Sequence, residues 1–485
     1  MHDAFLAVDL GTSGVRAGVI SLAGELAAFA QRPYDLIAGG QPGWVEQDAS
    51  VWWTAARDAM RDAVAAARGT TIVGACVGGQ GPSLVAVDEH GAPLANALIW
   101  MDRRAEDERQ WMAERLGHQV SPYSNVPKAA WLRRHRPALY ARTRHFLQSW
   151  DYIALRLTGV AVASSFAGAT VFPRELVAAA ELDPNKFPRE HVMGDAVGVI
   201  RPALAADLGL APGVVLAGGV NDSTATVLGG GLVRAGLALD LGGTSGGIAL
   251  AWDSALDVDG LTAWPAPTPG LFICGGPFAS AGRALPWFMS VAGYGPTDFA
   301  AVESDAGRVA PGADGLVFLP YLAGERTPIW DDRARGVFFG LTDRHTRAHL
   351  ARAVFEGVAF SLRHVADVLR EHGARIDELR LTGGQAKVRL WGRIKADVLG
   401  VPVVVPSVTE GALLGEAMLA AAGAGRVADL ASAVPRFIKE AARFVPEPAN
   451  APAYDGAYRT YRELYVRLRD LMRGDAARES AGSLR

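Results

Sequence analysis

The chain has 485 residues, a net charge of -3 and two cysteines. This length is too great for one ordinary core and suits two domains of about 200 to 250 residues each. Acidic and basic residues are spread along the chain, which argues against nucleic-acid or anionic-membrane partners, and Cys76 and Cys274 have no neighbouring ligands at zinc or disulfide spacing. Without a signal-peptide pattern or an apolar run of about 20 residues, we expect a cytoplasmic protein.

The first 20 residues predict two strands around a glycine turn. Residues 5–10 are apolar, residues 11–14 break the run, and an alternating strand follows. A third strand at residues 26–30 would complete an antiparallel meander. Further strands at residues 72–77 and 84–87, with a helix at residues 51–67 before them, indicate the α/β class.

The opening pattern recurs about 230 residues later. A strand at residues 237–241 leads into Gly242-Gly243-Thr244-Ser245-Gly246, which repeats the run from Asp9 to Gly14. This repeat predicts duplicated domains facing a shared cleft. We place the first domain at residues 1–235, the second at residues 236–475 and a disordered tail at residues 476–485.

The second half of the chain also shows clear helical and strand patterns. Leu350, Val354, Val358, Leu362, Val365 and Leu369 share one face of a core helix, with Gly373 as its stop. We expect a strand at residues 401–405, a small-residue helix at residues 411–422 and an amphipathic helix at residues 453–472.

The two glycine turns have the composition of phosphate-binding loops. Consecutive backbone N–H groups and the hydroxyls of Thr12, Ser13, Thr244 and Ser245 can hold phosphate oxygens without a basic side chain. The chain has five lysines and lacks the G-x-x-x-x-G-K-[ST] pattern, so a Walker-type site is excluded. A single such turn would be an ordinary hairpin; the pair favours phosphate binding.

Three charged residues near these loops are candidates for chemistry. Asp9 can hold Mg²⁺ through water, or alternatively form a local turn bond. Arg16 can add charge near the phosphates, or be an exposed strand residue. Asp222 follows a buried strand at residues 214–219; it can accept the proton of an attacking hydroxyl during phosphoryl transfer, or cap a helix.

A third glycine turn begins at Thr382. Gly383 and Gly384 follow a strand, and Lys387 and Trp391 follow on an apparent helix. Close approach of the backbone there can accept a flat adenine ring, although glycine pairs at strand ends are common.

The chain resembles the FGGY carbohydrate kinases. Residues 336–341 (GVFFGL) and, seven residues later, residues 349–356 (HLARAVFE) match the C-terminal signature of that family. Residues 324–328 (GERTP) resemble its xylulose kinase branch. The likeness spans nearly the whole chain and includes residues 44–48, 100–104, 127–131, 151–153 and 158–159.

This resemblance implies two actin-like domains of the ribonuclease H type that close over a sugar and ATP. It makes Asp222 the catalytic base, Asp9 a magnesium ligand, and the two loops phosphate-binding. On the nucleotide side it implies contacts from Gly11, Thr12, Ser13, Arg16, Gly243, Thr244, Ser245, Gly282, Gly383, Gly384 and Lys387. On the sugar side it implies contacts from Gln80, Gly81, Pro82, Trp100, Asp102 and Asp222.

The sequence departs from the xylulose kinase pattern beside the sugar. Those kinases usually carry a Met-His pair after the glutamine that corresponds to Gln80, whereas this chain has Gly81-Pro82-Ser83. Losing an imidazole removes a hydrogen-bonding partner and can change the preferred hydroxyl pattern. Asp102 remains a candidate hydroxyl acceptor, with a solvated loop carboxylate as the alternative. Val388 and Pro286 replace residues that are often polar on the nucleotide side.

We therefore predict an ATP- and Mg²⁺-dependent kinase for a small ketose or polyol, with D-xylulose as the first choice of substrate. Other pentuloses, erythrulose, pentitols and glycerol are alternatives. An actin-like nucleotide switch, or a sugar-binding regulator without catalysis, are the rival functions from other classes. Homodimers are common in the resembled family.

Overall fold

The computed structural model describes residues 3–38, 40–165, 170–243 and 245–482, with only the backbone described for residues 475–482. The chain divides into two compact units. The first contains Met1–Gly231 together with Glu410–Lys439, and the second contains Leu232–Thr409 together with Glu440–Arg485. The chain first passes from one unit to the other between Gly231 and Leu232, close to the boundary expected at residue 235. The expected second domain, residues 236–475, is interrupted, because residues 410–439 belong to the first unit.

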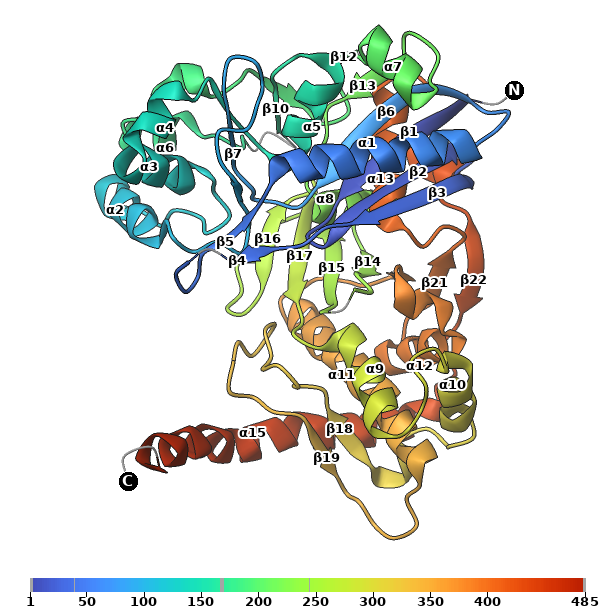
Figure 1. Ribbon diagram of the computed structural model, residues 1–485. Coiled ribbons are helices and arrows are strands. Elements are labelled where there is room, and N and C mark those ends of the chain that lie inside the picture. Colours follow the sequence, from blue (N-terminus) through green and yellow to red (C-terminus); the bar gives the residue numbers. More distant parts are fainter. Residues whose placement is uncertain (1–2, 39, 166–169, 244, 483–485) are drawn as a thin grey trace. The chain divides into compact units, whose positions relative to one another are not determined.

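The first unit is built on the sheet that opens the chain (Figure 1). Among the described residues this sheet has six strands, in the order β12, β13, β6, β1, β2, β3. The antiparallel pairing of β1 with β2 and of β2 with β3 confirms the predicted meander, and β6 joins β1 in parallel. The strands are β1 (Asp3–Leu10), β2 (Gly14–Ser21), β3 (Leu26–Pro33), β6 (Thr71–Gly79), β12 (Ala196–Val199) and β13 (Val215–Ala217).

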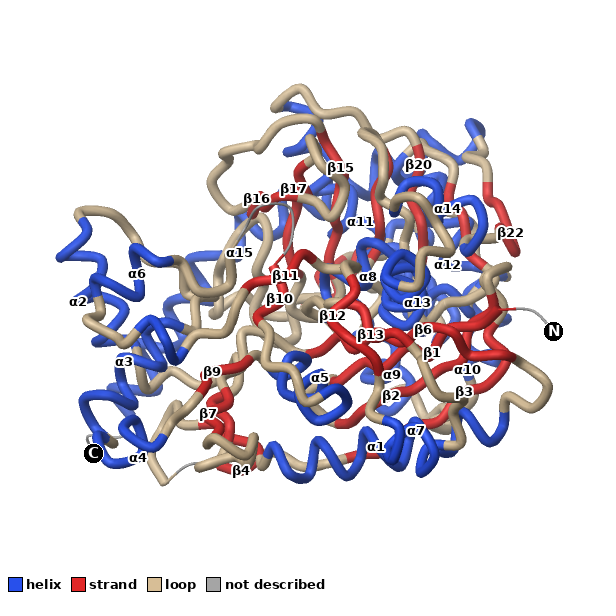
Figure 2. Tube along the Cα trace, turned by 90° about the horizontal axis from the view of Figure 1, so that it is seen from above, coloured by secondary structure: helices blue, strands red, loops and turns tan. Residues whose placement is uncertain are grey.

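Helices α1 and α13 cover opposite faces of this sheet, as Figure 2 shows. Helix α13 comes from the segment that returns from the second half of the chain. It approaches closely because the sheet offers glycines: a methyl group on Gly74 would lie 2.7 Å from the carbonyl oxygen of Ala420. The helices of this unit are α1 (Ala49–Ala66), α2 (Glu106–Leu116), α3 (Val126–His135), α4 (Pro137–Arg142), α5 (Ser149–Thr158), α6 (Arg174–Ala179), α7 (Pro202–Leu208), α8 (Asp222–Gly229), α13 (Gly411–Gly423) and α14 (Leu430–Phe437).

Alternation along β1 divides its side chains between the two faces. Leu6 belongs to the same core cluster as Trp52 of α1. Phe5 faces the other way and packs on Phe437 of α14, with ring centroids 5.8 Å apart. Successive side chains of a strand point to opposite faces, so Asp9 lies on the face of Phe5, the one that α13 covers.

A second cluster of apolar side chains in this unit supports the segments that follow β6. It joins Leu84, Met112 of α2, Trp131 of α3 and Phe146 of β9. The short strands of this unit are β4 (Ile37–Ala38), β5 (Val45–Gln47), β7 (Val85–Val87), β8 (Ala97–Leu98), β9 (His145–Leu147), β10 (Ala163–Ser165) and β11 (Glu190–Val192).

The second unit repeats the plan around its own sheet. Counting only the described residues, its strands run in the order β16, β17, β15, β14, β20, β21, β22, with β14 antiparallel to β15 and parallel to β20. The strands of this sheet are β14 (Leu237–Asp240), β15 (Gly247–Trp252), β16 (Thr262–Pro265), β17 (Phe272–Pro277), β20 (Glu378–Leu381), β21 (Val403–Pro406) and β22 (Glu440–Phe444). Strands β18 (Val317–Leu319) and β19 (Val337–Phe339) pair with each other in a separate sheet.

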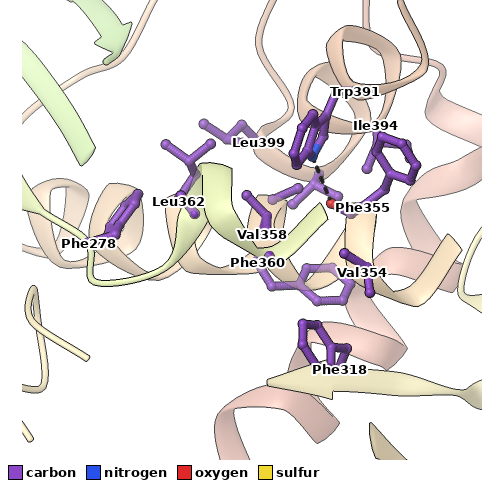
Figure 3. Close-up of a cluster of buried hydrophobic side chains, with 14 of the residues drawn as sticks. Phe278, Phe318, Val354, Phe355, Val358, Phe360, Leu362, Trp391, Ile394 and Leu399 are labelled. Carbon is purple, nitrogen blue, oxygen red and sulfur yellow. Dashed lines mark hydrogen bonds between the residues drawn. The ribbon is translucent and has the colours of Figure 1, made fainter. Parts of the chain in front are cut away.

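The core of the second unit centres on helix α11. Five of the six residues expected on its core face are buried, and Leu350 is partly buried. Trp391 of α12 packs against Phe355 of α11, and its Nε1 donates to the Phe355 carbonyl at 3.2 Å (Figure 3). The helices are α9 (Ala281–Val291), α10 (Phe299–Gly307), α11 (Arg347–Glu371), α12 (Arg389–Leu399) and α15 (Ala451–Gly482).

Helix α15 ends the described chain. Tyr461 anchors it through a 2.8 Å hydrogen bond with Tyr321 and a 3.0 Å bond with Ser361. The backbone stays helical through Gly482, where we expected a disordered tail, and residues 483–485 lie outside the described residues. Within the described chain, no helix combines the length and apolar character needed to cross a bilayer.

Candidate active site

Side chains from three other segments hold the turn between β1 and β2. Gln47 Nε2 donates to the Thr12 carbonyl at 2.7 Å, and the Tyr34 hydroxyl donates to the Gly11 carbonyl at 2.5 Å. Trp100 Nε1 donates to Thr12 Oγ1 at 3.0 Å. Within the described residues, the N–H groups of Thr12 and Ser13 have no protein partner. The turn is therefore fixed through its oxygen atoms while two N–H groups stay available.

Asp9 is the last residue but one of β1, separated from this turn by Leu10, and it is fully buried. It forms an ion pair with Arg16, whose other terminal nitrogen lies 3.1 Å from Glu410 Oε2. Burial raises the pKa of Asp9, and the charge of Arg16 opposes that rise. Asp9 Oδ1 has no hydrogen-bond partner among the described residues. One carboxylate oxygen of Asp9 is thus uncommitted, whereas Arg16 is shared by two carboxylates.

Glu416 belongs to α13, the helix that covers the face of the sheet on which Asp9 lies. It is fully buried, and neither carboxylate oxygen has a hydrogen-bond partner in the described structure. A methyl group on Gly78 would lie 2.2 Å from Glu416 Oε1, so the glycine makes room for it. Burial, reinforced by the charges of Asp9 and Asp222, raises the pKa of Glu416 well above its usual range.

Asp222 is the first residue of α8, and Asn221 is the residue that caps the helix. The side chain of Asn221 accepts from Thr224 N at 2.7 Å, so the capping alternative for Asp222 is wrong. Asp222 Oδ1 accepts from Ser223 N at 2.7 Å. Burial, with a further contribution from the charge of Asp9, raises the pKa of Asp222 to about 7. A carboxylate with this pKa can take up a proton near neutral pH.

Gln80 follows β6 and lies beside the first turn. Its backbone N–H donates to the Leu10 carbonyl at 2.8 Å, and its Nε2 donates to Gln47 Oε1 at 2.6 Å. Gln47 in turn uses its own amide nitrogen on Thr12, which fixes the orientation of both amides. Gln80 Oε1 is buried and has no partner among the described residues. Next to it, Gly81 lies against Trp150, whose ring would be 3.0 Å from a methyl group at that position.

Asp102 is neither solvated nor free. Its side chain is buried, and it accepts from Val45 N at 2.8 Å and from the Arg104 backbone N–H at 3.0 Å. The Arg104 guanidinium binds both carboxylate oxygens and lies over Trp44, 4.0 Å from the ring centroid. The solvated-loop alternative is therefore wrong. The predicted sugar contact stays a prediction, and a hydroxyl there would share Asp102 with Arg104.

The second glycine turn, in the second unit, has a different charge arrangement. Asp240, at the position that corresponds to Asp9, accepts from Gly242 N at 3.0 Å through Oδ1. Its Oδ2 lies 2.5 Å from Lys395 Nζ, which also donates to Gln385 Oε1 at 2.5 Å. Asp240, Lys395 and Gln385 are all buried. Both oxygens of Asp240 are committed, unlike those of Asp9.

The structure brings the predicted nucleotide-side residues of the second unit together. Ala281 N donates to the Ser245 carbonyl at 2.8 Å, which places Gly282 beside the second turn. A methyl group on Gly242 would lie 1.8 Å from the Thr382 carbonyl, so the turn that begins at Gly383 also adjoins it. The sites of Gly243, Gly384 and Lys387 are exposed, and Thr244 lies outside the described residues.

The two departures on the nucleotide side differ in burial, since Val388 is buried and Pro286 is exposed. Val388 is buried in the core of the second unit. Pro286 lies inside α9, next to Trp287, which is 36% exposed and stacks on Phe318 with ring centroids 5.8 Å apart.

Sequence reasoning did not select Glu410, Glu416 or Lys395. A signal for Glu416 was present, because it is the one charged residue among the small and apolar residues 411–423. Among the described residues, no group of three or more His, Cys, Asp or Glu side chains is arranged to hold a metal ion.

Comparison with known proteins gives the family of the chain. The model of the FGGY family of carbohydrate kinases, N-terminal domain, matches residues 4–229, and that of the C-terminal domain matches residues 241–424. The chain belongs to the FGGY family of carbohydrate kinases. It is therefore an enzyme that phosphorylates a carbohydrate, and the family implies ATP as co-substrate. The predicted family and the α/β class with two actin-like domains are confirmed.

Individual relatives of this carbohydrate kinase span nearly its full length. It is 29% identical to a xylulose kinase of Bacillus subtilis, over 96% of this chain and 97% of that protein. The crystal structure of xylulose kinase from Rhodospirillum rubrum is 31% identical, with a TM-score of 0.81 over 96% of this chain and 99% of that one. A gluconokinase of Bacillus subtilis is also 29% identical, over 80% of this chain and 81% of that protein.

Proposed function

We propose that this carbohydrate kinase transfers the γ-phosphoryl group of ATP to a hydroxyl of a small ketose or polyol, with D-xylulose, giving D-xylulose 5-phosphate, as the first choice. One observation supports the assignment most strongly. The charge of Asp9 contributes to the pKa of Asp222, which is raised to about 7, and Asp9 lies two residues before the turn whose two N–H groups have no partner in the described structure. A proton acceptor and a phosphate-binding turn thus lie in one unit.

The proposed step is a direct transfer of the γ-phosphoryl group to the substrate hydroxyl. The substrate hydroxyl oxygen forms a bond to the γ-phosphorus as the bond from that phosphorus to the bridging oxygen of ADP breaks, and the hydroxyl proton passes to Asp222. Thr12 Oγ1 accepts from Trp100, so its own hydroxyl hydrogen remains free to donate to the transferring phosphoryl group. Ser13 and the two free N–H groups of the turn add further donors, the arrangement that stabilises developing charge on phosphate oxygens.

Asp9 fits the role of a magnesium ligand. Its Oδ1, which has no partner among the described residues, is a hard oxygen donor of the kind that Mg²⁺ prefers. Mg²⁺ bound there would neutralise charge on the phosphates. On the nucleotide side we assign Gly243, Ser245, Gly282, Gly383, Gly384 and Lys387 to binding ATP.

Gln80 is the strongest candidate for recognising the sugar. Its amide orientation is fixed by Gln47, which leaves Gln80 Oε1 as a buried acceptor without a donor. An unpaired buried acceptor costs about 1 to 3 kcal/mol, which a substrate hydroxyl would recover. Gly81 and Pro82 offer no side-chain hydrogen bond in place of the Met-His pair, so the remote hydroxyls of the substrate are recognised less directly. This difference supports testing ketoses and polyols beyond D-xylulose.

Coupled ADP release tests the proposal. The enzyme is assayed with ATP and Mg²⁺ against D- and L-ketopentoses, erythrulose, ketohexoses, pentitols, glycerol and gluconate. Stimulation by D-xylulose above the other compounds supports the first choice, and preference for another ketose or polyol assigns that compound instead. Preference for gluconate would reject the ketose and polyol class, and no stimulation by any compound would overturn the proposal.

A further inference from the structure

Lys128 of α3 is a buried amine, and the charge of Asp102 acts on it. Its residue is 5% exposed, and its Nζ donates to the Pro82 carbonyl at 2.8 Å and to the Ile99 carbonyl at 2.9 Å. Within the described residues it forms no ion pair. Burial lowers the pKa of Lys128 to about 7. Burying an amine in this way costs free energy that an apolar side chain would not cost, so we expect the two hydrogen bonds to have a role beyond packing.

The two carbonyls belong to the segments that carry the proposed sugar contacts. Pro82 directly follows Gln80 and Gly81, and Ile99 directly precedes Trp100 and lies three residues before Asp102. Leu84 and Leu98, just beyond these two residues, are joined by two backbone hydrogen bonds of 2.9 and 3.0 Å, whereas no backbone bond among the described residues joins Pro82 to Ile99 itself. Lys128 therefore bridges two loop segments at the point where they leave their neighbouring strands.

Both segments also reach the phosphate-binding turn. Trp100 Nε1 donates to Thr12 Oγ1, and Gln80 reaches the Thr12 carbonyl through Gln47. The turn also has anchors of its own, from the Tyr34 hydroxyl to the Gly11 carbonyl at 2.5 Å and from Gly11 N to the Gly14 carbonyl at 3.0 Å, so a displacement of either segment acts first on the acceptor side. The two hydrogen bonds of Lys128, which we call the Lys128 clasp, thus fix the segments that carry the proposed sugar contacts relative to the turn that faces the transferring phosphoryl group.

We propose that Lys128 is a positioning residue for the acceptor substrate: its bonds to the Pro82 and Ile99 carbonyls hold the Gln80–Pro82 and Trp100–Asp102 segments in the geometry that binds the sugar or polyol. This inference rests on the proposed function of those segments. Loosening a site by about 1 Å is enough to reduce catalysis markedly, so the clasp acts through preorganisation and without touching the reacting atoms. An amine keeps at least two N–H donors whether or not it is protonated, so the clasp does not depend on charge.

Lys128→Met tests the clasp, because methionine keeps a flexible side chain of similar length without N–H donors. We expect the KM for D-xylulose, or for the panel compound that the wild-type enzyme prefers, to rise at least tenfold while the KM for ATP changes less than twofold. Lys395→Met is the matched control, since it removes the other buried lysine and is expected to act on the KM for ATP. Equal changes in both KM values for Lys128→Met, or no change, would overturn the inference.

Amine rescue provides an independent measurement if Lys128→Met does not fold. Lys128→Ala is assayed with n-propylamine, and tetramethylammonium serves as a control that has the same charge and no N–H donors. Recovery of acceptor affinity with n-propylamine alone supports the clasp, and its absence refutes it. A wild-type enzyme that phosphorylates none of the compounds would instead refute the proposed function, so the two failures are distinguishable.

Discussion

Asp222 sets the pH dependence that we expect for this kinase. Its pKa is raised to about 7, so the carboxyl is mostly protonated and inactive as a base below that pH. The kcat/KM for the acceptor should therefore rise about tenfold per pH unit up to about pH 7 and then level off. Measurement of kcat/KM from pH 5.5 to pH 8.5 checks this. A profile that falls over this range would show that Asp222 is not the base.

The variant Asp222→Asn gives the matching residue test. An amide cannot accept the hydroxyl proton, so kcat should fall by about 10² to 10⁴. Binding of ATP, measured by calorimetry, should be retained because Asp222 is assigned no contact with the nucleotide. Turnover close to that of the wild-type enzyme would place the base elsewhere.

Glu416 should make the protein less stable as the pH rises. The pKa of Glu416 is raised well above its ordinary value of 4.5, so its contribution to stability is fully present below pH 4.5 and is lost as the pH rises toward the pKa of the folded state. We expect Glu416→Gln to be more stable than the wild-type protein at pH 8, because the amide carries no charge that must be buried.

Urea unfolding of both proteins at pH 4.5 and at pH 8 measures this difference. The advantage of the glutamine variant should shrink toward the lower pH. An advantage of equal size at both pH values would show that packing, and not ionisation, separates the two proteins.

At the scale of elements, the two glycine turns share a sequence but differ in how their aspartates are used. Asp9 keeps one free oxygen, whereas Asp240 is saturated by Gly242 N–H and by Lys395 of α12. The duplicated strand and turn thus provide a candidate metal ligand in the first unit. In the second unit they provide a link between the second glycine turn and the segment that begins at Gly383.

The Asp240–Lys395 pair should stabilise the second unit and support ATP binding. Lys395→Met leaves a buried carboxylate unpaired, which costs about 3 to 5 kcal/mol. The double variant Asp240→Asn with Lys395→Met removes both charges and should recover part of that loss. Urea unfolding and the KM for ATP measure the two effects. If the double variant were as unstable as the sum of the single variants, the two residues would be acting independently.

At the scale of the whole molecule, the first unit is completed by residues 410–439, which lie far away in the sequence. We expect a fragment of residues 1–231 not to fold alone, because one face of its sheet would lose α13 and α14. A second fragment that joins residue 231 to residues 410–439 by a short Gly/Ser linker should fold. Such a linker is feasible since a methyl group on Gly229 would lie 1.8 Å from the Gly411 carbonyl.

Far-UV circular dichroism and urea unfolding compare the two fragments. Cooperative unfolding of the fragment of residues 1–231 alone would show that α13 is not needed to complete the sheet.

The sequence predicted the parts of this molecule that depend on local pattern. The meander, the paired turns, the helix ended by Gly373 and the position of Asp222 after a buried strand all follow from glycine spacing and hydrophobic period. It did not predict the return of residues 410–439, because a small-residue helix carries no mark of the sheet on which it packs. Nor did it predict that Arg104 binds both oxygens of Asp102, or that Glu416 is buried with no hydrogen-bond partner in the described part of the chain, since both depend on how distant segments pack.

Because the first unit combines two distant segments of the chain, the ribosome completes its parts at different times. On the ribosome, 178 residues separate Gly231 from Glu410. At about 5 to 20 residues per second, the opening sheet waits roughly 10 to 35 s for the helices that cover it. During that interval the nascent chain presents an uncovered apolar sheet face, so its yield in the cell should depend on chaperones that shield such surfaces.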